Sequence, residues 1–311
     1  MAGAIRVAIV GTDAEAQWWE RQAQAAPQTR VVARVVQGPE SGPRAQARWR
    51  EIVGNPEVDA VCVCTPVERR PDLTISALEA GKHALVPLPV AANWESAQRM
   101  AEIARDRGAL LRATLPDRHR PAIARMHAWI TAGAIGDPLV LVCRAGRPAG
   151  QSLAEPQADA VEALLARAAG VASWLIGGFT AAIGLDSPTG ETVTAIFTRA
   201  ADQAAWVEAS LADDTAEFVV EVTGRDGYAS ARSDGEGLER AALGLRDPTA
   251  PFRETVLESV RPDTYGAREW EEFVAAIHAG ERRAGPAEAM DAMRLWLAAR
   301  RSARSGVAEV A

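Results

Sequence analysis

Acid–base and anion-binding side chains are concentrated in one short segment of this chain. It reads Asp117-Arg118-His119-Arg120, which combines the side chain that titrates nearest neutral pH with two guanidinium groups. This cluster could take part in substrate binding, and because arginine pairs with carboxylate or phosphate through two parallel hydrogen bonds, Arg118 together with Arg167 could form a site for an anion. A solvated, charged linker between two domains is the other interpretation. The sequence leaves both open.

Two of the three cysteines are expected to lie together. Cys62 and Cys64 belong to the apolar run 60–64, and Cys143 stands apart from them. Alternate residues of a strand share a face, so the first two thiols should lie side by side. A metal site would need further Cys or His at suitable spacing, and none is nearby. We therefore expect buried, reduced thiols and no metal.

The composition indicates a soluble protein of two domains. The chain has 311 residues, 48% apolar and 24% charged, with a net charge of -7. This length exceeds one typical domain, and the negative charge argues against nucleic-acid binding. The uncharged stretch 168–185 is interrupted by Gly177-Gly178, which favours a buried helix followed by a strand over a membrane span. Because no signal pattern is present, we expect a cytoplasmic location without membrane association.

Strands and helices alternate through the first third of the chain. Segments with helical periodicity separate the apolar runs that predict strands, which are 5–10, 31–36, 60–64, 84–86 and 110–114. Such alternation is typical of a parallel sheet covered by helices on both faces. Doubly wound sheets bind their ligands at the carboxyl ends of the strands. The sequence therefore predicts an α/β domain over residues 1–120.

Residues 121–311 have a different pattern. The predicted elements are helices at 121–131, 269–277 and 287–301 and strands near 192–197, 206–211 and 218–222. Strands that follow one another without intervening helices predict an antiparallel sheet. We expect an α+β domain with its helices on one face of that sheet.

Several phrases of the chain resemble sequences of the Gfo/Idh/MocA family of oxidoreductases, in the family's order and spacing. They are Asn55-Pro56-Glu57-Val58-Asp59-Ala60-Val61, Thr65-Pro66, Ala77-Leu78-Glu79-Ala80-Gly81-Lys82-His83, Gly133-Ala134-Ile135-Gly136-Asp137-Pro138, Trp174-Leu175-Ile176-Gly177 and Phe273-Val274-Ala275-Ala276-Ile277-His278-Ala279-Gly280. The resemblance covers practically the whole chain. It implies an N-terminal Rossmann-like domain of the dinucleotide-binding type and a C-terminal α+β domain for substrate binding and oligomerisation. It also implies NAD or NADP as cofactor.

The resemblance places a dinucleotide site at the first strand–helix turn, with the fingerprint G-x-G-x-x-G/A. Gly11 is present and Ala16 is tolerable at the third glycine, but Asp13 stands at the second. A carboxylate about 4 Å from a pyrophosphate costs about 4 kcal/mol at an effective dielectric constant of about 20. The same turn fits a capping box, in which Thr12 and Glu15 satisfy the free N–H groups of the helix start. We favour the capping interpretation.

Other positions that the resemblance assigns to the cofactor also differ from the family. The ribose-binding acid after the second strand is absent, which leaves Gln37 for a weaker hydrogen bond or Arg34 for an NADP phosphate. The family's T-P-N turn reads Thr65-Pro66-Val67 and lacks its asparagine. The degenerate cofactor site would thus consist of Gly11, Thr12, Asp13, Gln37, Thr65 and Pro66.

The positions that the resemblance assigns to catalysis hold residues that cannot transfer a proton near neutral pH. Leu88 replaces the lysine of a Glu-Lys-Pro motif, and leucine cannot relay a proton. The family's Asp and His, four residues apart on a helix, correspond to Ala163 and Arg167. Arginine stays protonated near neutral pH and cannot act as a general base. Because Arg118 matches a pocket arginine of the family, it is expected with His119 and Arg167 to line a pocket for a small anionic or sugar-like ligand.

These losses are coherent, since each removes part of one reaction. The sequence favours a non-redox pseudoenzyme that serves as a binding, regulatory or partner subunit without a dinucleotide cofactor. The alternative is a divergent NAD(P)-dependent oxidoreductase of a sugar or related polyol, with His119, Tyr265 or Lys82 as its acid. Nine tryptophans and the alternating strands also predict a homo-oligomer, or a hetero-oligomer with a related family member, through the second domain's sheet.

Overall fold

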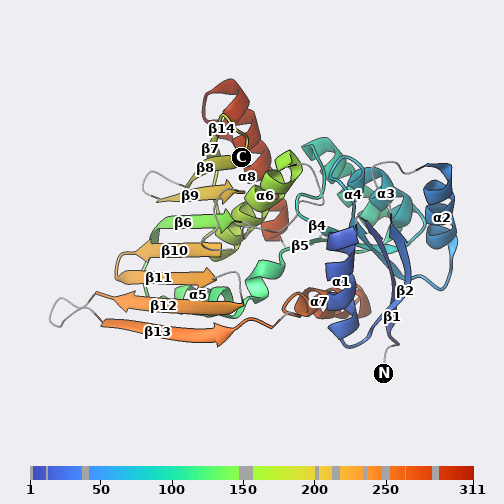
Figure 1. The fold of residues 1–311 in the computed structure, drawn as a ribbon, viewed down its shortest axis with the longest axis horizontal. Helices are drawn as coiled ribbons and strands as arrows, with labels where there is room; N and C mark the ends of the chain where they lie inside the picture. Colours follow the sequence, from blue (N-terminus) through green and yellow to red (C-terminus); the bar gives the residue numbers. More distant parts are fainter. Residues whose placement is uncertain are drawn as a thin grey trace. The chain divides into compact units, whose positions relative to one another are not determined.

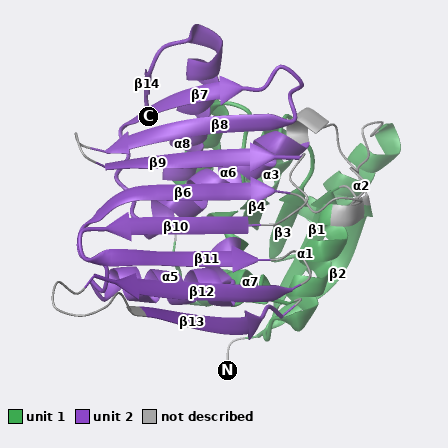
Figure 2. Cartoon of the chain, turned by 60° about the vertical axis from the view of Figure 1, so that its left-hand side comes forward, with its two compact units in different colours: residues 1–116, 264–290 green, residues 117–263, 291–311 purple. Residues whose placement is uncertain are grey.

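The chain divides into two compact units, each with its own sheet. The computed structural model describes residues 3–11, 13–36, 42–146, 157–199, 203–211, 218–233, 237–246, 253–262, 264–281 and 287–311. The first unit comprises residues 1–116 and 264–290, and the second comprises 117–263 and 291–311 (Figure 2). The predicted division after residue 120 differs from this, because the segment 264–290 returns to the first unit.

The first unit contains a five-stranded parallel sheet in the order β2-β1-β3-β4-β5. Its strands are β1 Ile5–Gly11, β2 Thr29–Val36, β3 Ala60–Cys64, β4 His83–Pro87 and β5 Leu111–Thr114. The order reverses on either side of β1, so crossover helices lie on both faces. Buried Val61 and Val63 alternate with buried Cys62 and Cys64 along β3, in agreement with cover on both faces. The predicted doubly wound, Rossmann-like domain is confirmed.

Among the described helices of the first unit, the helix Trp94–Arg107 has capping residues at both ends. The helices of this unit are α1 Asp13–Ala25, α2 Pro43–Gly54, α3 Arg70–Glu79, α4 Trp94–Arg107 and α7 Ala267–His278 (Figure 1). The Asn93 side chain accepts a hydrogen bond from the Ser96 amide at 2.8 Å and caps α4. Gly108 ends the same helix with φ at 64°, a conformation that favours glycine.

Aromatic packing explains why α7 belongs to the first unit. Trp270 and Phe273 of α7 are fully buried in one apolar cluster with Trp19 of α1 and Ile9 of β1. The Trp270 indole donates to the Trp19 carbonyl at 3.3 Å. Burying large aromatic side chains is among the strongest apolar contributions to a fold, so this face of α7 fixes the helix against α1 despite the distance along the chain.

The second unit contains a nine-stranded sheet in the order β13-β12-β11-β10-β6-β9-β8-β7-β14. Its strands are β6 Pro138–Gly146, β7 Ala181–Asp186, β8 Thr192–Arg199, β9 Gln203–Ser210, β10 Phe218–Gly224, β11 Gly227–Ser233, β12 Leu238–Leu245, β13 Arg253–Val260 and β14 Glu309–Val310. Only β6 and β9 run parallel; the other neighbouring strands are antiparallel. The predicted α+β class is confirmed.

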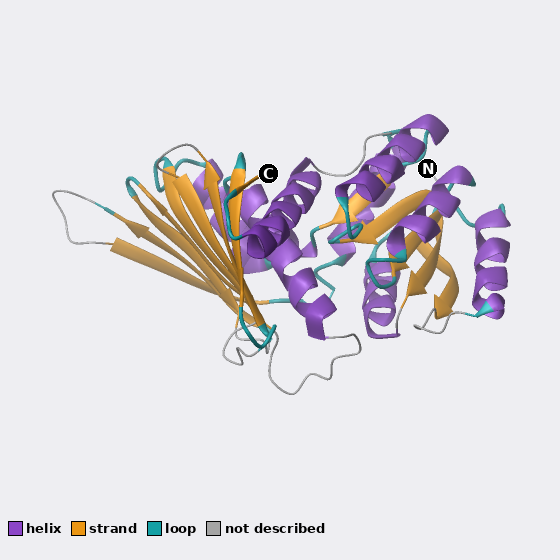
Figure 3. Cartoon of the chain, turned by 90° about the horizontal axis from the view of Figure 1, so that it is seen from above, coloured by secondary structure: helices purple, strands orange, loops and turns teal. Residues whose placement is uncertain are grey.

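Three helices lie behind one face of this sheet in the view of Figure 2. They are α5 Pro121–Thr131, α6 Gln157–Leu175 and α8 Ala287–Ser305. The stretch 168–185 accordingly forms the end of a helix and then a strand, as predicted, and no helix in the described ranges is long and apolar enough to cross a membrane. The splayed strands are seen edge-on in Figure 3. The opposite face leaves side chains such as Trp206 46% exposed.

Candidate functional site

The first strand–helix turn keeps its glycine for a packing reason. A Cβ atom at Gly11 would lie only 2.4 Å from the carbonyl oxygen of Cys64, so no larger residue fits where β1 approaches β3. Helix α1 begins two residues later, at Asp13. Thr12, Gln37 and the Asp13 side chain lie outside the described parts of the chain. The predicted capping box and ribose contact stay predictions.

Thr65 and Pro66 follow β3 directly, at the carboxyl edge of the sheet. Thr65 is buried, and its hydroxyl has no hydrogen-bond partner among the described residues. Its backbone carbonyl accepts a hydrogen bond from the Arg70 guanidinium at 2.7 Å. An unsatisfied buried hydroxyl one residue after Cys64, the register partner of Gly11, is compatible with a ligand group at this edge.

Arg70 is a central residue of this edge that the sequence did not single out. One terminal nitrogen donates to the carbonyls of Pro87 and Pro89, at 3.1 and 2.6 Å. The other lies 3.4 Å from a carboxylate oxygen of Glu15, in the first turn of α1. The guanidinium therefore joins the ends of β3 and β4 to the start of α1. Arg70 is the first residue of α3 and precedes Pro71. Nothing in this local sequence indicates that its acceptors lie at the ends of β3 and β4.

Leu88 lies in the loop that Arg70 holds, directly after β4. Its side chain is only 4% exposed, and the Leu88–Pro89 peptide bond is cis. The position therefore carries an apolar side chain packed into the first unit. It provides no group that could donate, accept or hold a proton.

Lys82 lies at the opposite side of the same sheet, where the strands begin. Its ammonium donates to the carbonyls of Asn55 and Val58, each at 2.8 Å, in the turn that precedes β3. Its neighbour His83 accepts a hydrogen bond from the Leu110 amide at 2.9 Å, and burial lowers the pKa of this imidazole. Both side chains thus stabilise the amino edge of the sheet. Lys82 is remote from the carboxyl edge, where a parallel sheet binds its ligand.

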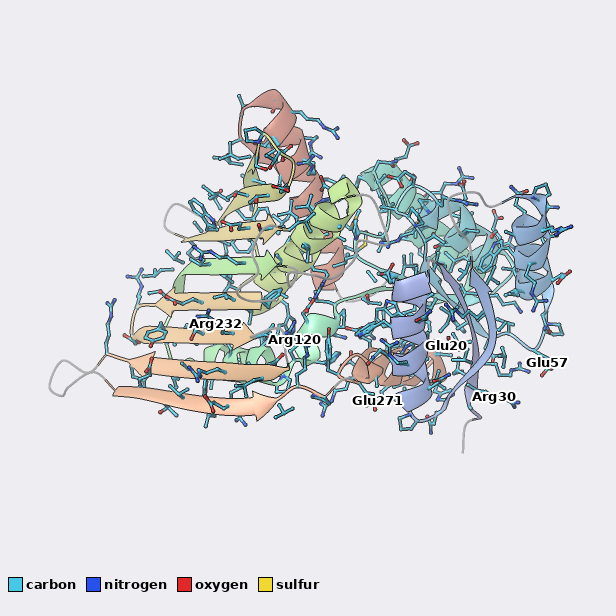
Figure 4. All side chains as sticks on the ribbon, viewed as in Figure 1. Glu20, Arg30, Glu57, Arg120, Arg232 and Glu271 are labelled. Atoms are coloured by element: carbon cyan, nitrogen blue, oxygen red, sulfur yellow. The ribbon has the colours of Figure 1, made fainter. Side chains whose placement is uncertain are left out.

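Arg34 and Tyr265, two further alternatives, both pack against α1. The Arg34 guanidinium lies 3.6 Å from the Glu20 carboxylate (Figure 4 labels Glu20). The Tyr265 ring lies 5.6 Å from that of Trp18, measured between centroids. A Cβ atom at Gly266 would lie 2.5 Å from the same indole, so Trp18 fits closely against this segment. These contacts belong to the packing of α1.

The charged segment after β5 starts the second unit and forms the 3-10 helix η1, Pro116–His119. Asp117 is fully buried, and Arg167 of α6 donates to its two oxygens at 2.9 and 2.7 Å. Burial alone would raise the pKa of Asp117, but the charges and hydrogen bonds of Arg167 and Arg120 outweigh it and hold this pKa at about 2. The carboxylate is therefore ionised at every physiological pH. A solvated linker, one of the two interpretations of this segment, does not describe Asp117 and Arg120.

Arg120 and Glu239 form a second ion pair in the same unit. The Arg120 Nε donates to Glu239 on β12 at 2.8 Å, and both side chains are almost fully buried (Figure 4 labels Arg120). The other Glu239 oxygen accepts from the Ala122 amide at 3.0 Å, in the first turn of α5. The Arg120 guanidinium also stands over the Phe218 ring, 5.8 Å from its centroid. This pair fixes the start of α5 to the sheet.

The remaining predicted site residues lie on η1 and α6, the elements that also carry Asp117 and Arg167. Ala163 lies one helical turn before Arg167 on α6, and Arg118 and His119 lie on η1; all are partly buried. The predicted domain boundary after residue 120 separates Arg118 and His119 from Arg167, whereas the structure places all three in the second unit. The guanidinium fork of Arg167 is already filled by a carboxylate, a contact that the sequence did not predict. An external anion at Arg167 would have to compete with Asp117.

The cysteines lie where the strand pattern predicted. The sulfur atoms of Cys62 and Cys64 are 3.4 Å apart, and both side chains are buried and not disulfide-bonded. Burial raises the pKa of the Cys64 and Cys143 thiols. In the described ranges, no group of three or more His, Cys, Asp or Glu side chains is arranged to hold a metal ion.

Comparison with known proteins identifies the first domain. Residues 5–115 match the family model described as "Oxidoreductase family, NAD-binding Rossmann fold". The 1,5-anhydro-D-fructose reductase of Ensifer adhaerens is 39% identical over 89 residues, which is 29% of this chain and 27% of that protein. Levoglucosan dehydrogenase of Pseudarthrobacter phenanthrenivorans is 32% identical over 88 residues, 28% of this chain and 23% of that protein. The aligned stretch thus spans about a quarter of each relative.

The fold agrees over the full length. Levoglucosan dehydrogenase in complex with NADH and levoglucosan superposes with a TM-score of 0.80 at 19% identity, covering 99% of each chain. An NAD-binding oxidoreductase of Klebsiella pneumoniae gives a TM-score of 0.80, also at 19% identity and 99% coverage of each chain. The match of residues 5–115 to the model of the Gfo/Idh/MocA oxidoreductase family agrees with the resemblance seen in the sequence. The whole chain has the two-domain fold of these oxidoreductases.

Proposed function

We propose that this chain is a non-redox member of the Gfo/Idh/MocA family, serving as a binding, regulatory or partner subunit. The observation that carries the proposal is the hydrogen-bonded pair of Arg167 and Asp117. Arg167 stands where the family resemblance places a proton-relaying histidine, and a guanidinium held by an ionised carboxylate cannot take up a proton. The position contributes charge balance to the second unit instead of acid–base chemistry.

The first unit supports the same proposal. A reaction between a sugar hydroxyl and a nicotinamide needs a group that moves the hydroxyl proton, and the buried Leu88 side chain has none. Glu15, in the first turn of α1, also places a carboxylate where a dinucleotide would bring its pyrophosphate, and the sequence has a second acidic residue, Asp13, in the same turn. These residues fit a dinucleotide poorly, although Gly11 and the Thr65 hydroxyl would tolerate one.

Cofactor titration tests the proposal. Trp18 and Trp19 lie on α1, so NADH or NADPH bound at the turn before this helix should quench the tryptophan emission. We expect no saturable quenching at micromolar cofactor and no turnover with a panel of sugars, inositols and sugar acids. Asp13→Gly should improve any residual binding. A micromolar dissociation constant for either cofactor in the wild type would contradict the proposal.

A divergent oxidoreductase is the second candidate, because the family match and the NADH-bound fold relative favour it. Of its three candidate acids, Lys82 serves the amino edge of the sheet and Tyr265 packs on Trp18. His119 is left, on the same short helix as Asp117. Turnover that disappears in His119→Ala but persists in His127→Ala would establish this candidate. Its substrate would be a sugar or related polyol, by analogy with the relatives.

We also propose that the exposed face of the nine-stranded sheet binds a second copy of the chain. Register partners place Ile183, Ile196, Trp206 and Val142 in one row across β7, β8, β9 and β6. The adjacent row pairs Glu208 with Arg144. An apolar row flanked by charges of both signs suits an interface between two copies related by a two-fold axis, in which each positive charge can meet a negative charge of the other copy. A related family member is the alternative partner.

A further inference from the structure

The Arg70 side chain is an unusual cation, because it is buried and its donors are directed to loops. Its exposure is only 7%. Three of its hydrogen bonds go to backbone carbonyls, those of Thr65, Pro87 and Pro89, which lie immediately after β3 and at the end of β4. Carbonyls that follow parallel strands normally face the ligand crevice or water. Here a side chain of the same domain satisfies them.

Glu15 balances this buried charge. Its carboxylate lies 3.4 Å from the Arg70 guanidinium and is 32% exposed, so the pair is open to solvent on the Glu15 side only. Glu15 belongs to the first turn of α1, where the helix dipole favours a negative charge. That is also where a dinucleotide fold places the pyrophosphate. Removing Glu15 would leave a buried cation without a counter-ion, which is strongly unfavourable.

We propose that Glu15 and Arg70 form an internal clasp that replaces the cofactor in the first domain. The Glu15 carboxylate supplies the negative charge at the start of α1, and Arg70 holds the β3 and β4 loops that a bound dinucleotide would otherwise order. An incoming pyrophosphate meets a like charge and must displace Glu15 from Arg70. The clasp rests on the proposed function, because it gives the reason why the domain folds without a dinucleotide.

Inorganic pyrophosphate tests the clasp directly. In Glu15→Gln, Arg70 loses its counter-ion, so we expect the melting temperature to fall by about 5 °C and millimolar pyrophosphate to restore much of that loss. Wild type and the control Glu57→Gln should show no such response. Glu57 pairs with Arg6 at the amino edge of the same sheet. Its variant therefore also deprives an arginine of a carboxylate partner, but at a site remote from the crevice.

Arg70 variants separate the clasp from a simple charge effect. Glu15→Gln/Arg70→Gln has no unpaired cation, so it should be more stable than Glu15→Gln and insensitive to pyrophosphate. This double variant also provides the test if Glu15→Gln does not fold. In Arg70→Gln, hydrogen exchange should accelerate at the amides of Leu88 and Val90, because the loop loses its donor.

Each of three results would overturn the clasp: equal stabilisation of wild type and Glu15→Gln by pyrophosphate, no effect of pyrophosphate on a folded Glu15→Gln, or stabilisation of the double variant. The proposed function fails by a different result, micromolar binding of NADH to the wild type. A clasp that fails while the wild type still binds no NADH leaves the proposed function intact.

Discussion

Arg167 and Asp117 face each other across 50 positions of sequence, with the guanidinium of one donating to both carboxylate oxygens of the other. Asp117 is fully buried and Arg167 partly so. A bidentate pair of this kind combines charge with fixed geometry, and it joins η1 to α6. The second unit thus uses, for its own stability, a position that the family resemblance assigns to chemistry.

Acid should weaken the second unit through Asp117. The pKa of this carboxyl falls from 3.8 to about 2 in the folded chain. A depressed folded-state pKa means that its stabilisation is complete above about pH 4 and is lost as the pH falls toward 2. The shift corresponds to about 2 kcal/mol. Urea unfolding should show that the free energy of unfolding of the wild type falls as the pH is lowered from 7 to 2.5. The control Asp106→Asn, at an exposed residue, should show the same fall, and Asp117→Asn should show a smaller one. An unchanged slope in Asp117→Asn would contradict the assignment.

The Arg120–Glu239 pair should show strong coupling. Both side chains are almost completely buried, and Glu239 also holds the Ala122 amide. Removing one partner of a buried pair costs up to about 3–5 kcal/mol, and without Glu239 the Arg120 guanidinium loses its closest counter-ion and keeps the longer contact with Asp117, at 3.5 Å. We expect Glu239→Leu to lose a large part of that stability, and Arg120→Leu/Glu239→Leu to be more stable than Glu239→Leu. Denaturant unfolding of the four variants of a double-mutant cycle measures the coupling, and additive losses would show that the pair is unimportant.

The three thiols should be inert in the folded protein. Cys62, Cys64 and Cys143 are all buried, and burial raises the pKa of the latter two, so little thiolate is present at neutral pH. A thiol reagent at pH 8 should label the native chain slowly and all three cysteines rapidly in guanidinium chloride. Fast labelling of the native chain at Cys62 or Cys64 would show that β3 is more accessible than its packing indicates.

The exposed sheet face should control assembly. Trp206 is flanked by Ile196 on β8 and Val142 on β6. Placing a carboxylate in this apolar row by Trp206→Glu should shift the sedimentation profile at micromolar concentration from dimer or larger species to monomer. Val32→Glu, at an exposed apolar residue of the first unit, provides the control. Wild-type protein that is monomeric and does not co-purify with a relative would rule out the partner-subunit role.

Much of the fold could be predicted, because it depends on local patterns. Alternation and β-branched runs identified the parallel strands, and glycines ended the helices where a left-handed residue was needed; Gly81, Gly108 and Gly133 all have positive φ. The return of α7 to the first unit could not be predicted. Its apolar face has the same pattern whether it packs on α1 or on the second sheet, and only the fit of Trp270 against Trp19 distinguishes the two.

The candidate site divides in the same way. Residue identity alone determined what three of these positions can contribute: Leu88 and Ala163 carry no proton-transferring group in any fold, and an arginine at position 167 stays charged. The tertiary structure decided what the charges do instead. Arg70 meets Glu15 and Arg167 meets Asp117 only because helical segments 50 or more residues apart in the sequence converge in the fold. A hydrogen bond acts over about 3 Å, so its partner depends on that convergence and leaves no trace in the local sequence.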